Sequence, residues 1–123
     1  MRKFWIAALG CGLLMVGTAQ AADLAAGKAS FEKFNCASCH GADAKSPILP
    51  TYPVLAGQHQ DYLKHALVAY QRGQKGEPAS ANVRKNAIMG GMAMQLSATD
   101  IENITSWLSS LPTPLSVHPN EFR

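Results

Sequence analysis

The stretch Cys36-Ala37-Ser38-Cys39-His40 decides how this chain folds, because it dictates what the fold must enclose. It is a C-x-x-C-H string, the pattern that attaches a c-type haem. Each cysteine thiol can add to one of two vinyl groups on neighbouring pyrrole rings, and the adjacent histidine can reach the iron. The sequence therefore predicts one covalently bound haem c (iron), with Cys36 and Cys39 as attachment points and His40 as a metal ligand.

A C-x-x-C pair also occurs in redox disulfides and as half of a zinc site. A zinc site needs a second pair of ligands, and His59, His65 and His118 show no such spacing. A thioredoxin-like unit needs a β-α-β pattern around the motif, and the sequence has none. The surroundings of the motif therefore favour haem attachment.

The first 21 residues have the pattern of a secretory signal peptide. Met1-Arg2-Lys3 is a short basic start, residues 4–17 form an apolar run, and Ala19-Gln20-Ala21 is a small-x-small cleavage site. The apolar run is shorter than the about 20 residues that span a bilayer. A lipoprotein reading of Ala8-Leu9-Gly10-Cys11 leaves too little apolar sequence before the cysteine. We therefore expect residues 1–21 to be removed during export and the mature form to have no membrane span.

Removing 21 of the 123 residues leaves 102, enough for one small domain, residues 22–123, with a modest core. The whole chain has a formal net charge of +3, and without Arg2 and Lys3 nine basic side chains remain against eight acidic ones. The strongly basic surface of a nucleic-acid-binding protein is therefore missing. The basic excess lies in residues 22–85 and the acidic excess in residues 86–123, so the molecule can orient itself toward a partner.

The apolar pattern of the mature chain predicts an all-α fold. Residues 22–34 and 58–72 carry apolar side chains at helical intervals, and Gly73 is expected to end the second of these helices. A last helix begins at Ser97, where Asp100 follows three residues later in a near capping box, and it stops at Pro112. No segment alternates as a β-strand does.

The connecting segments are read from their prolines and glycines. Residues 41–52 contain Pro47 and Pro50 and are predicted to form a loop. Residues 74–86 read as an exposed loop with a short helix before Met89. Residues 112–123 show no periodicity and are expected to be a surface tail.

Taken together, these residues resemble the class I c-type cytochromes, most closely the single-haem relatives of the small periplasmic c-four or c-553 type. The resemblance covers the mature chain up to Leu111. The chain has one C-x-x-C-H motif where c-four proper has two, and the tail has no counterpart. Four blocks in this order carry the likeness: residues 36–41; residues 52–58; Tyr62, Leu63, Leu67 and Tyr70; and residues 89–92 leading to 96–101.

The resemblance implies a small cytochrome c fold of three to five helices wrapped around one covalently attached haem. Its M-x-G-x-x-x-x-L-S frame selects Met89 as the second axial ligand, ahead of Met92 and Met94. Each methionine has the alternative role of a soft gap-filler beside the haem. The Pro-x-Leu segment implies that the Pro53 carbonyl accepts a hydrogen bond from the ligating His40, although Pro53 can also be a plain loop-former. His59, His65 and His118 read as solvated side chains.

A His and Met pair fills both axial positions and raises the reduction potential above that of two imidazoles. The resemblance therefore implies an electron carrier and not an enzyme: a periplasmic monohaem cytochrome, expected to be a monomer, that shuttles single electrons between respiratory or dehydrogenase proteins. These partners would bind transiently at the haem edge, and Lys33, Lys45, Lys64 and Lys85 are candidates for steering acidic ones. Two alternatives stay open: a small electron-accepting subunit of a larger dehydrogenase or oxidase, and a haem enzyme or gas sensor with an open sixth position.

Overall fold

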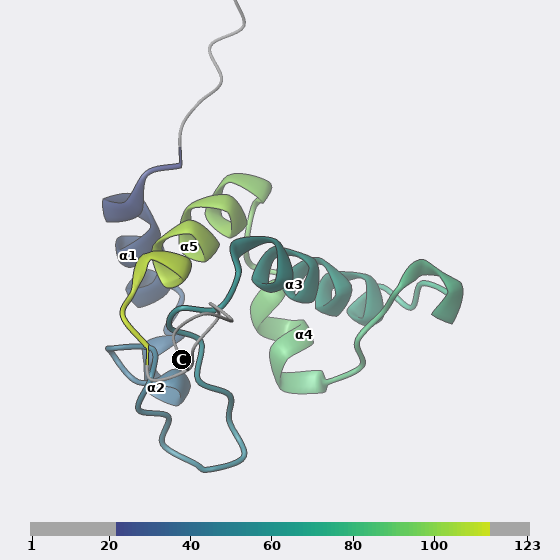
Figure 1. Ribbon diagram of the computed structural model, residues 1–123. Coiled ribbons are helices and arrows are strands. Elements are labelled where there is room, and N and C mark those ends of the chain that lie inside the picture. The colour runs from purple at the N-terminus through teal and green to yellow at the C-terminus, as the bar shows by residue number, and fades with distance from the viewer. Residues whose placement is uncertain (1–21, 114–123) are drawn as a thin grey trace, which may run out of the picture.

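The computed structural model describes residues 22–113, which form helices and loops and no β-strand (Figure 1). The predicted all-α fold is confirmed. The predicted signal peptide lies outside the described residues, as does the tail beyond Thr113. No helix within the described part is long and apolar enough to cross a membrane. The elements are α1 (Leu24–Lys33), α2 (Ala37–His40), α3 (Gln60–Gln74), the 3-10 turn η1 (Ala79–Ala81), α4 (Ala87–Ala93) and α5 (Ala98–Ser110).

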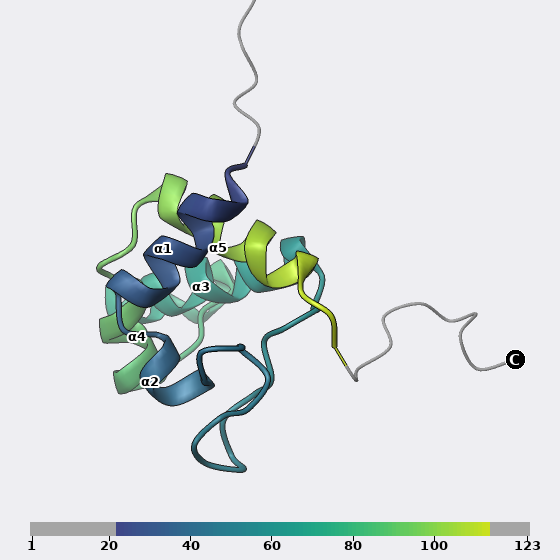
Figure 2. The same ribbon diagram turned by 90° about the vertical axis from the view of Figure 1, so that its left-hand side faces the viewer.

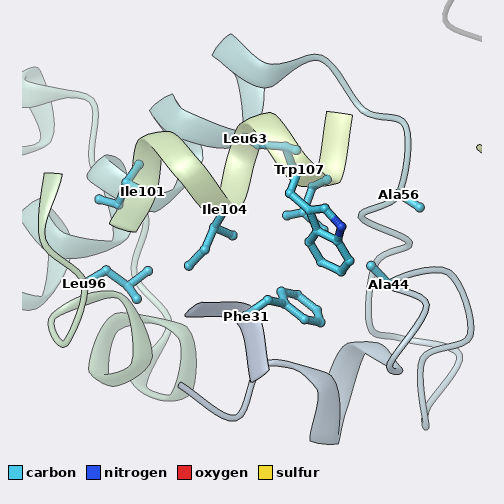
Figure 3. Packing of buried hydrophobic residues seen from close by; sticks show 9 residues of the cluster. Phe31, Ala44, Ala56, Leu63, Leu96, Ile101, Ile104 and Trp107 are labelled. Atoms are coloured by element: carbon cyan, nitrogen blue, oxygen red, sulfur yellow. The ribbon is translucent and has the colours of Figure 1, made fainter. Parts of the chain in front are cut away.

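Helices α1 and α5 come from opposite ends of the described chain and pack against each other (Figure 1 and Figure 2). Gly27 permits this close approach, because a Cβ atom there would lie 2.1 Å from the carbonyl oxygen of Asn103. The rings of Phe31 and Trp107 face each other across the same contact, with centroids 5.1 Å apart (Figure 3). The resemblance to the class I c-type cytochromes implies this contact of Gly27 and Phe31 on the first helix with Trp107 on the last, and the structure shows it.

The core continues from this pair along the inner face of α5 toward α3 and α4. Ile101 and Ile104 are buried on α5, and Leu63 on α3 and Leu96 before α5 meet them (Figure 3). Leu111, directly after the last residue of α5, is only half-buried.

Capping side chains begin three of the helices as the sequence chemistry requires. Asp23 accepts a hydrogen bond from the Ala26 N–H at 3.0 Å to begin α1, and Asn86 accepts one from the Met89 N–H at 2.9 Å to begin α4. At α5 the predicted capping box is present: the Ser97 hydroxyl accepts from the Asp100 N–H, and the Asp100 carboxylate accepts from the Ser97 N–H. The hydrogen bond from the Ser97 hydroxyl is the main reason why the pKa of Asp100 is lowered.

The prediction that Gly73 ends the second helix is wrong. Helix α3 continues to Gln74, and the chain turns at Gly76, which has a φ of 74°. Gly73 serves a different purpose, because a Cβ atom there would lie 2.0 Å from the carbonyl oxygen of Arg84. The missing side chain thus lets the segment before α4 return along α3.

The short helix predicted before Met89 is the single 3-10 turn η1. Helix α4, which contains Met89, was not predicted. Its sequence includes Gly90 and Gly91, and glycine is a poor helix former. Packing against α3 stabilises α4.

Candidate haem-binding site

A cavity of about 500 Å³ lies among the C-x-x-C-H turn, the loop that follows it, α3 and α4. Most of its lining is apolar, with leucine side chains from α3, α5 and the loop. The size and the lining suit a buried apolar ligand. All the site residues predicted from the sequence line this one cavity: Cys36, Cys39, His40, Pro53 and Met89.

The two cysteines reach the cavity because the chain reverses sharply after α1. Asn35 adopts a φ of 59°, and the Cys36 N–H donates back to the Phe31 carbonyl at 3.0 Å. The single turn of α2 then carries Cys39 to the same side as Cys36. Cys36 and Cys39 are not joined as a disulfide, and burial raises the pKa of Cys36. Two cysteine side chains that line one apolar cavity are the donor set that thioether attachment requires.

His40 is 6 % exposed, and its Nδ1 atom lies 3.1 Å from the carbonyl oxygen of Pro53. Because a carbonyl can only accept, the proton of the neutral ring belongs on Nδ1. Burial lowers the pKa of His40, which favours this neutral form. Nε2 therefore keeps a free lone pair, and no described residue hydrogen-bonds it. A histidine oriented in this way is ready to bind a metal.

The loop after His40 is closed by Asp43. Its carboxylate accepts hydrogen bonds from the Lys45 N–H at 3.0 Å and from the Ser46 N–H at 2.9 Å, and the Ser46 hydroxyl donates to it as well. These bonds lower the pKa of Asp43. Sequence reasoning missed Asp43, although an aspartate shortly before serine and proline is a common signal of such a turn.

Ala44 connects this turn to the segment that carries Pro53. The side chain is fully buried with a φ of 56°, a left-handed conformation that is rare for alanine. In this conformation the Ala44 carbonyl accepts hydrogen bonds from the Leu55 N–H at 2.8 Å and the Ala56 N–H at 3.0 Å. The position of the Pro53 carbonyl therefore depends on the turn at Asp43.

The three candidate methionines lie in different surroundings. Met89 is half-buried in the cavity wall, and no described residue hydrogen-bonds its sulfur. Met92 also lines the cavity, but the Gln95 side chain donates to its sulfur at 3.7 Å. Met94 is 44 % exposed and lines a separate pocket between α3 and α5. The geometry thus agrees with the sequence frame in favouring Met89.

Gln71 on α3 holds α4 in place. Its side-chain amide donates to the carbonyl oxygens of Ala93 at 2.8 Å and Leu96 at 3.0 Å, at the end of α4 and just beyond it. Nothing around Gln71 in the sequence points to this role, because a glutamine on a helix surface is usually solvated.

The described histidines other than His40 are not at the cavity. His59 and His65 are exposed and do not line it, and His118 lies outside the described residues. Within residues 22–113, no group of three or more His, Cys, Asp and Glu side chains could hold a metal ion, so the zinc reading gains no support.

The four candidate lysines differ in their contacts. Lys64 forms an ion pair with Glu102 and joins α3 to α5, while the ammonium group of Lys33 lies 5.0 Å from the centroid of the Phe34 ring. Lys45 and Lys85 are exposed. Lys33 is exposed as well, so three of the four candidate lysines are available for steering a partner.

Comparison with known proteins gives a consistent result. The family model "Cytochrome c" matches residues 24–112. The curated protein "Cytochrome c-554(548)" of Halomonas halodenitrificans is 40 % identical over 91 residues, which cover 73 % of this chain and 98 % of that protein. The "Thiosulfate dehydrogenase electron acceptor" of Stutzerimonas stutzeri is 32 % identical over 114 residues, which cover 89 % of this chain and 49 % of that protein.

A solved structure gives the same likeness in three dimensions. The crystal structure of reduced recombinant cytochrome c4 from Pseudomonas stutzeri matches with a TM-score of 0.64 and 35 % sequence identity. The match covers 75 % of this chain and 47 % of that one. The chain thus spans nearly all of the Halomonas protein and about half of the other two.

Proposed function

Because this chain belongs to the cytochrome c family and is an electron carrier with covalently attached haem c, we propose a specific role for each site residue. Cys36 and Cys39 attach the haem, His40 and Met89 are the axial ligands, and Pro53 orients His40. The mature protein is a periplasmic monomer that shuttles single electrons between respiratory or dehydrogenase proteins.

The observation that carries this assignment is that Met89, on α4, lines the same cavity as Cys36, Cys39 and His40 around α2. Haem c supplies a reversible one-electron couple at its iron. The chain's own contribution is to fix both axial groups. Pro53 holds the His40 ring through Nδ1, and Asn86 and Gln71 hold the helix that bears Met89.

The cavity lining also fits an electron carrier better than an enzyme. No Asp or Glu within residues 22–113 lines it, so this part of the chain places no carboxylate there that could act as a general acid or base. In the proposed assignment, Met89 would fill the position that an enzyme or gas sensor keeps open. The alternative of an open sixth site therefore has no support from the arrangement of these residues.

Periplasmic export rests on the proposed signal peptide of residues 1–21. The partner class has a more specific indication, because one relative is named as the electron acceptor of a thiosulfate dehydrogenase. This name favours a second candidate function, in which the chain is the small electron-accepting component of a larger dehydrogenase. This chain spans only about half of that relative, so the similarity alone does not assign a thiosulfate dehydrogenase as its partner.

The visible spectrum of the purified protein tests the axial assignment. The ferric wild type should show the weak iron-to-sulfur charge-transfer band, and the substitution Met89→Ala should abolish it. Met92→Ala is the matched control, because Met92 lines the same cavity one helical turn away, and it should keep the band. Loss of the band in Met92→Ala alone would reverse the assignment, and a protein without covalent haem after maturation would refute the proposal.

A further inference from the structure

Among the residues that the structure describes, Arg84 is the only Lys, Arg, Asp or Glu that lines the cavity. Its side chain is partly buried, and it takes part in none of the ion pairs found within the described part of the chain. A guanidinium that lines a mostly apolar cavity and has no opposite charge beside it among the described residues is free to pair with an anion that enters the cavity.

Two tyrosines and the backbone hold Arg84 in position. The guanidinium carbon lies 5.4 Å from the centroid of the Tyr62 ring and 5.6 Å from that of Tyr70, and Nη2 donates to the Tyr62 hydroxyl at 3.2 Å. The Arg84 N–H also donates to the Ala69 carbonyl at 2.9 Å, beside the close contact with Gly73. The side chain is thus fixed at the cavity wall before any ligand binds.

The guanidinium has N–H donors beyond the one that bonds the Tyr62 hydroxyl. It has five N–H groups in a planar fork, and such a fork matches the two oxygens of a carboxylate. Hydrogen bonding to the tyrosine hydroxyls, first of all to Tyr62, raises the pKa of Arg84, so the group stays charged. The cavity wall therefore presents a permanent positive charge with free donors.

We infer that Arg84 is the binding site for a carboxylate of the haem that occupies this cavity. Haem c carries two propionate groups, and the lining offers no other Lys or Arg side chain to receive either of them. This inference rests on the proposed function, which places the haem here. A positive charge near the iron also favours the ferrous state, because that state carries one positive charge fewer. Arg84 would therefore help to set the reduction potential.

The test compares Arg84→Gln and Arg84→Lys with the control Lys85→Gln. Lys85 is the next residue, is exposed and does not line the cavity, so its substitution removes the same charge outside the site. The readouts are the midpoint potential and the propionate bending band in the resonance Raman spectrum. In Arg84→Gln we expect the ferrous-to-ferric ratio at a fixed applied potential to fall about tenfold, equivalent to ~59 mV for one electron. The Raman band should move to lower frequency.

The other variants separate charge from geometry. Arg84→Lys keeps the charge without the fork, so its potential should fall less than that of Arg84→Gln while its Raman band still moves. Lys85→Gln should change the ratio less than about twofold and leave the band in place, because an exposed charge is screened.

A potential and a Raman band in Arg84→Gln that both match the Lys85→Gln control would overturn the inference. It is also overturned if only the binding of an acidic redox partner weakens, since the carboxylate would then belong to the partner. If Arg84→Gln does not accumulate, an unmoved Raman band in Arg84→Lys is decisive against the inference. Failure of the proposed function would be seen in a different observation: the wild type itself would lack the covalent haem or the iron-to-sulfur band.

Discussion

The Nδ1 atom of His40 lies 3.1 Å from the carbonyl oxygen of Pro53, 13 residues further along the chain. Because this acceptor is a backbone atom, a substitution of the Pro53 side chain leaves it in place. What a substitution can disturb is the loop between the two residues. The orientation of the proposed ligand therefore depends on the residues that close that loop, first among them Asp43.

We expect Asp43→Ala to loosen the loop, because it removes the acceptor of three hydrogen bonds. The amide protons of Leu55 and Ala56, which bond the Ala44 carbonyl, should then exchange about tenfold faster through local opening. Hydrogen exchange followed by NMR measures this. Asp43→Asn keeps one side-chain oxygen and should exchange more slowly than Asp43→Ala. Equal protection in wild type and Asp43→Ala would show that the turn does not hold the Pro53 segment.

The substitution Gly27→Ala should destabilise the protein by about 1–3 kcal/mol, the usual cost of overpacking a closed contact. A Cβ atom at this position would lie 2.1 Å from a backbone oxygen of α5, so one helix must move. Gly91→Ala is the matched control, since a Cβ atom there meets nothing within 4 Å in helix α4. It should be neutral or stabilising by up to about 1 kcal/mol. Chemical denaturation measures the free energy of unfolding of both variants, and equal values would contradict the packing argument.

Asp100→Asn should lower the free energy of unfolding near neutral pH by about 1 kcal/mol, the typical contribution of a helix cap. The pKa of Asp100 is lowered in the folded protein, mainly by the Ser97 hydroxyl, so its carboxylate stabilises the fold fully above the ordinary value of 3.8. This contribution is lost as the pH falls below 3.8 and through the folded pKa.

Chemical denaturation at several pH values measures this pH dependence. The difference between wild type and Asp100→Asn should be constant above about pH 5 and should shrink in acid. Asp61→Asn, an exposed acidic residue in the first turn of α3, is the control and should change stability by less than about 0.5 kcal/mol. A difference that grows in acid would contradict the sign of the Asp100 shift.

Ile88 should contribute to docking of a redox partner, because it lines the cavity and is nevertheless 64 % exposed. The substitution Ile88→Ser should slow bimolecular electron transfer about threefold to tenfold, since an apolar anchor at the centre of a small interface contributes on the order of 1 kcal/mol. Stopped-flow kinetics with a physiological or substitute donor measures the rate. Met94→Ser is the control, because Met94 is 44 % exposed but lines another pocket. Equal slowing in both variants would place the docking surface elsewhere.

The features that could be predicted from the sequence are local ones. The C-x-x-C-H motif, the Ser97–Asp100 capping box and the buried face of α5 all depend on residues a few positions apart. The structure shows the capping box and the burial of Ile101, Ile104 and Leu108. The packing of Gly27 against α5 followed from the family resemblance, since nothing near Gly27 in the sequence points to a contact with Asn103.

The features that were missed depend on distant contacts. Gly73 looks like a helix end in isolation, and only the returning backbone at Arg84 explains why the helix continues through it. Helix α4 has weak intrinsic propensity and owes its stability to α3. Arg84 has no motif around it, and its role becomes visible only when the cavity is seen.

The fastening of α4 by Gln71 has a consequence for how the molecule comes apart. The His40 side of the cavity adjoins the core of α1 and α5, whereas α4 is anchored mainly on α3, with two hydrogen bonds from one glutamine at its end. Mild denaturant should therefore release α4 and the Met89 side of the site first, while the side formed by Cys36, Cys39 and His40 keeps its native arrangement. Detachment of α4 would then open the cavity on one side without loss of the haem, because the bonds to Cys36 and Cys39 remain.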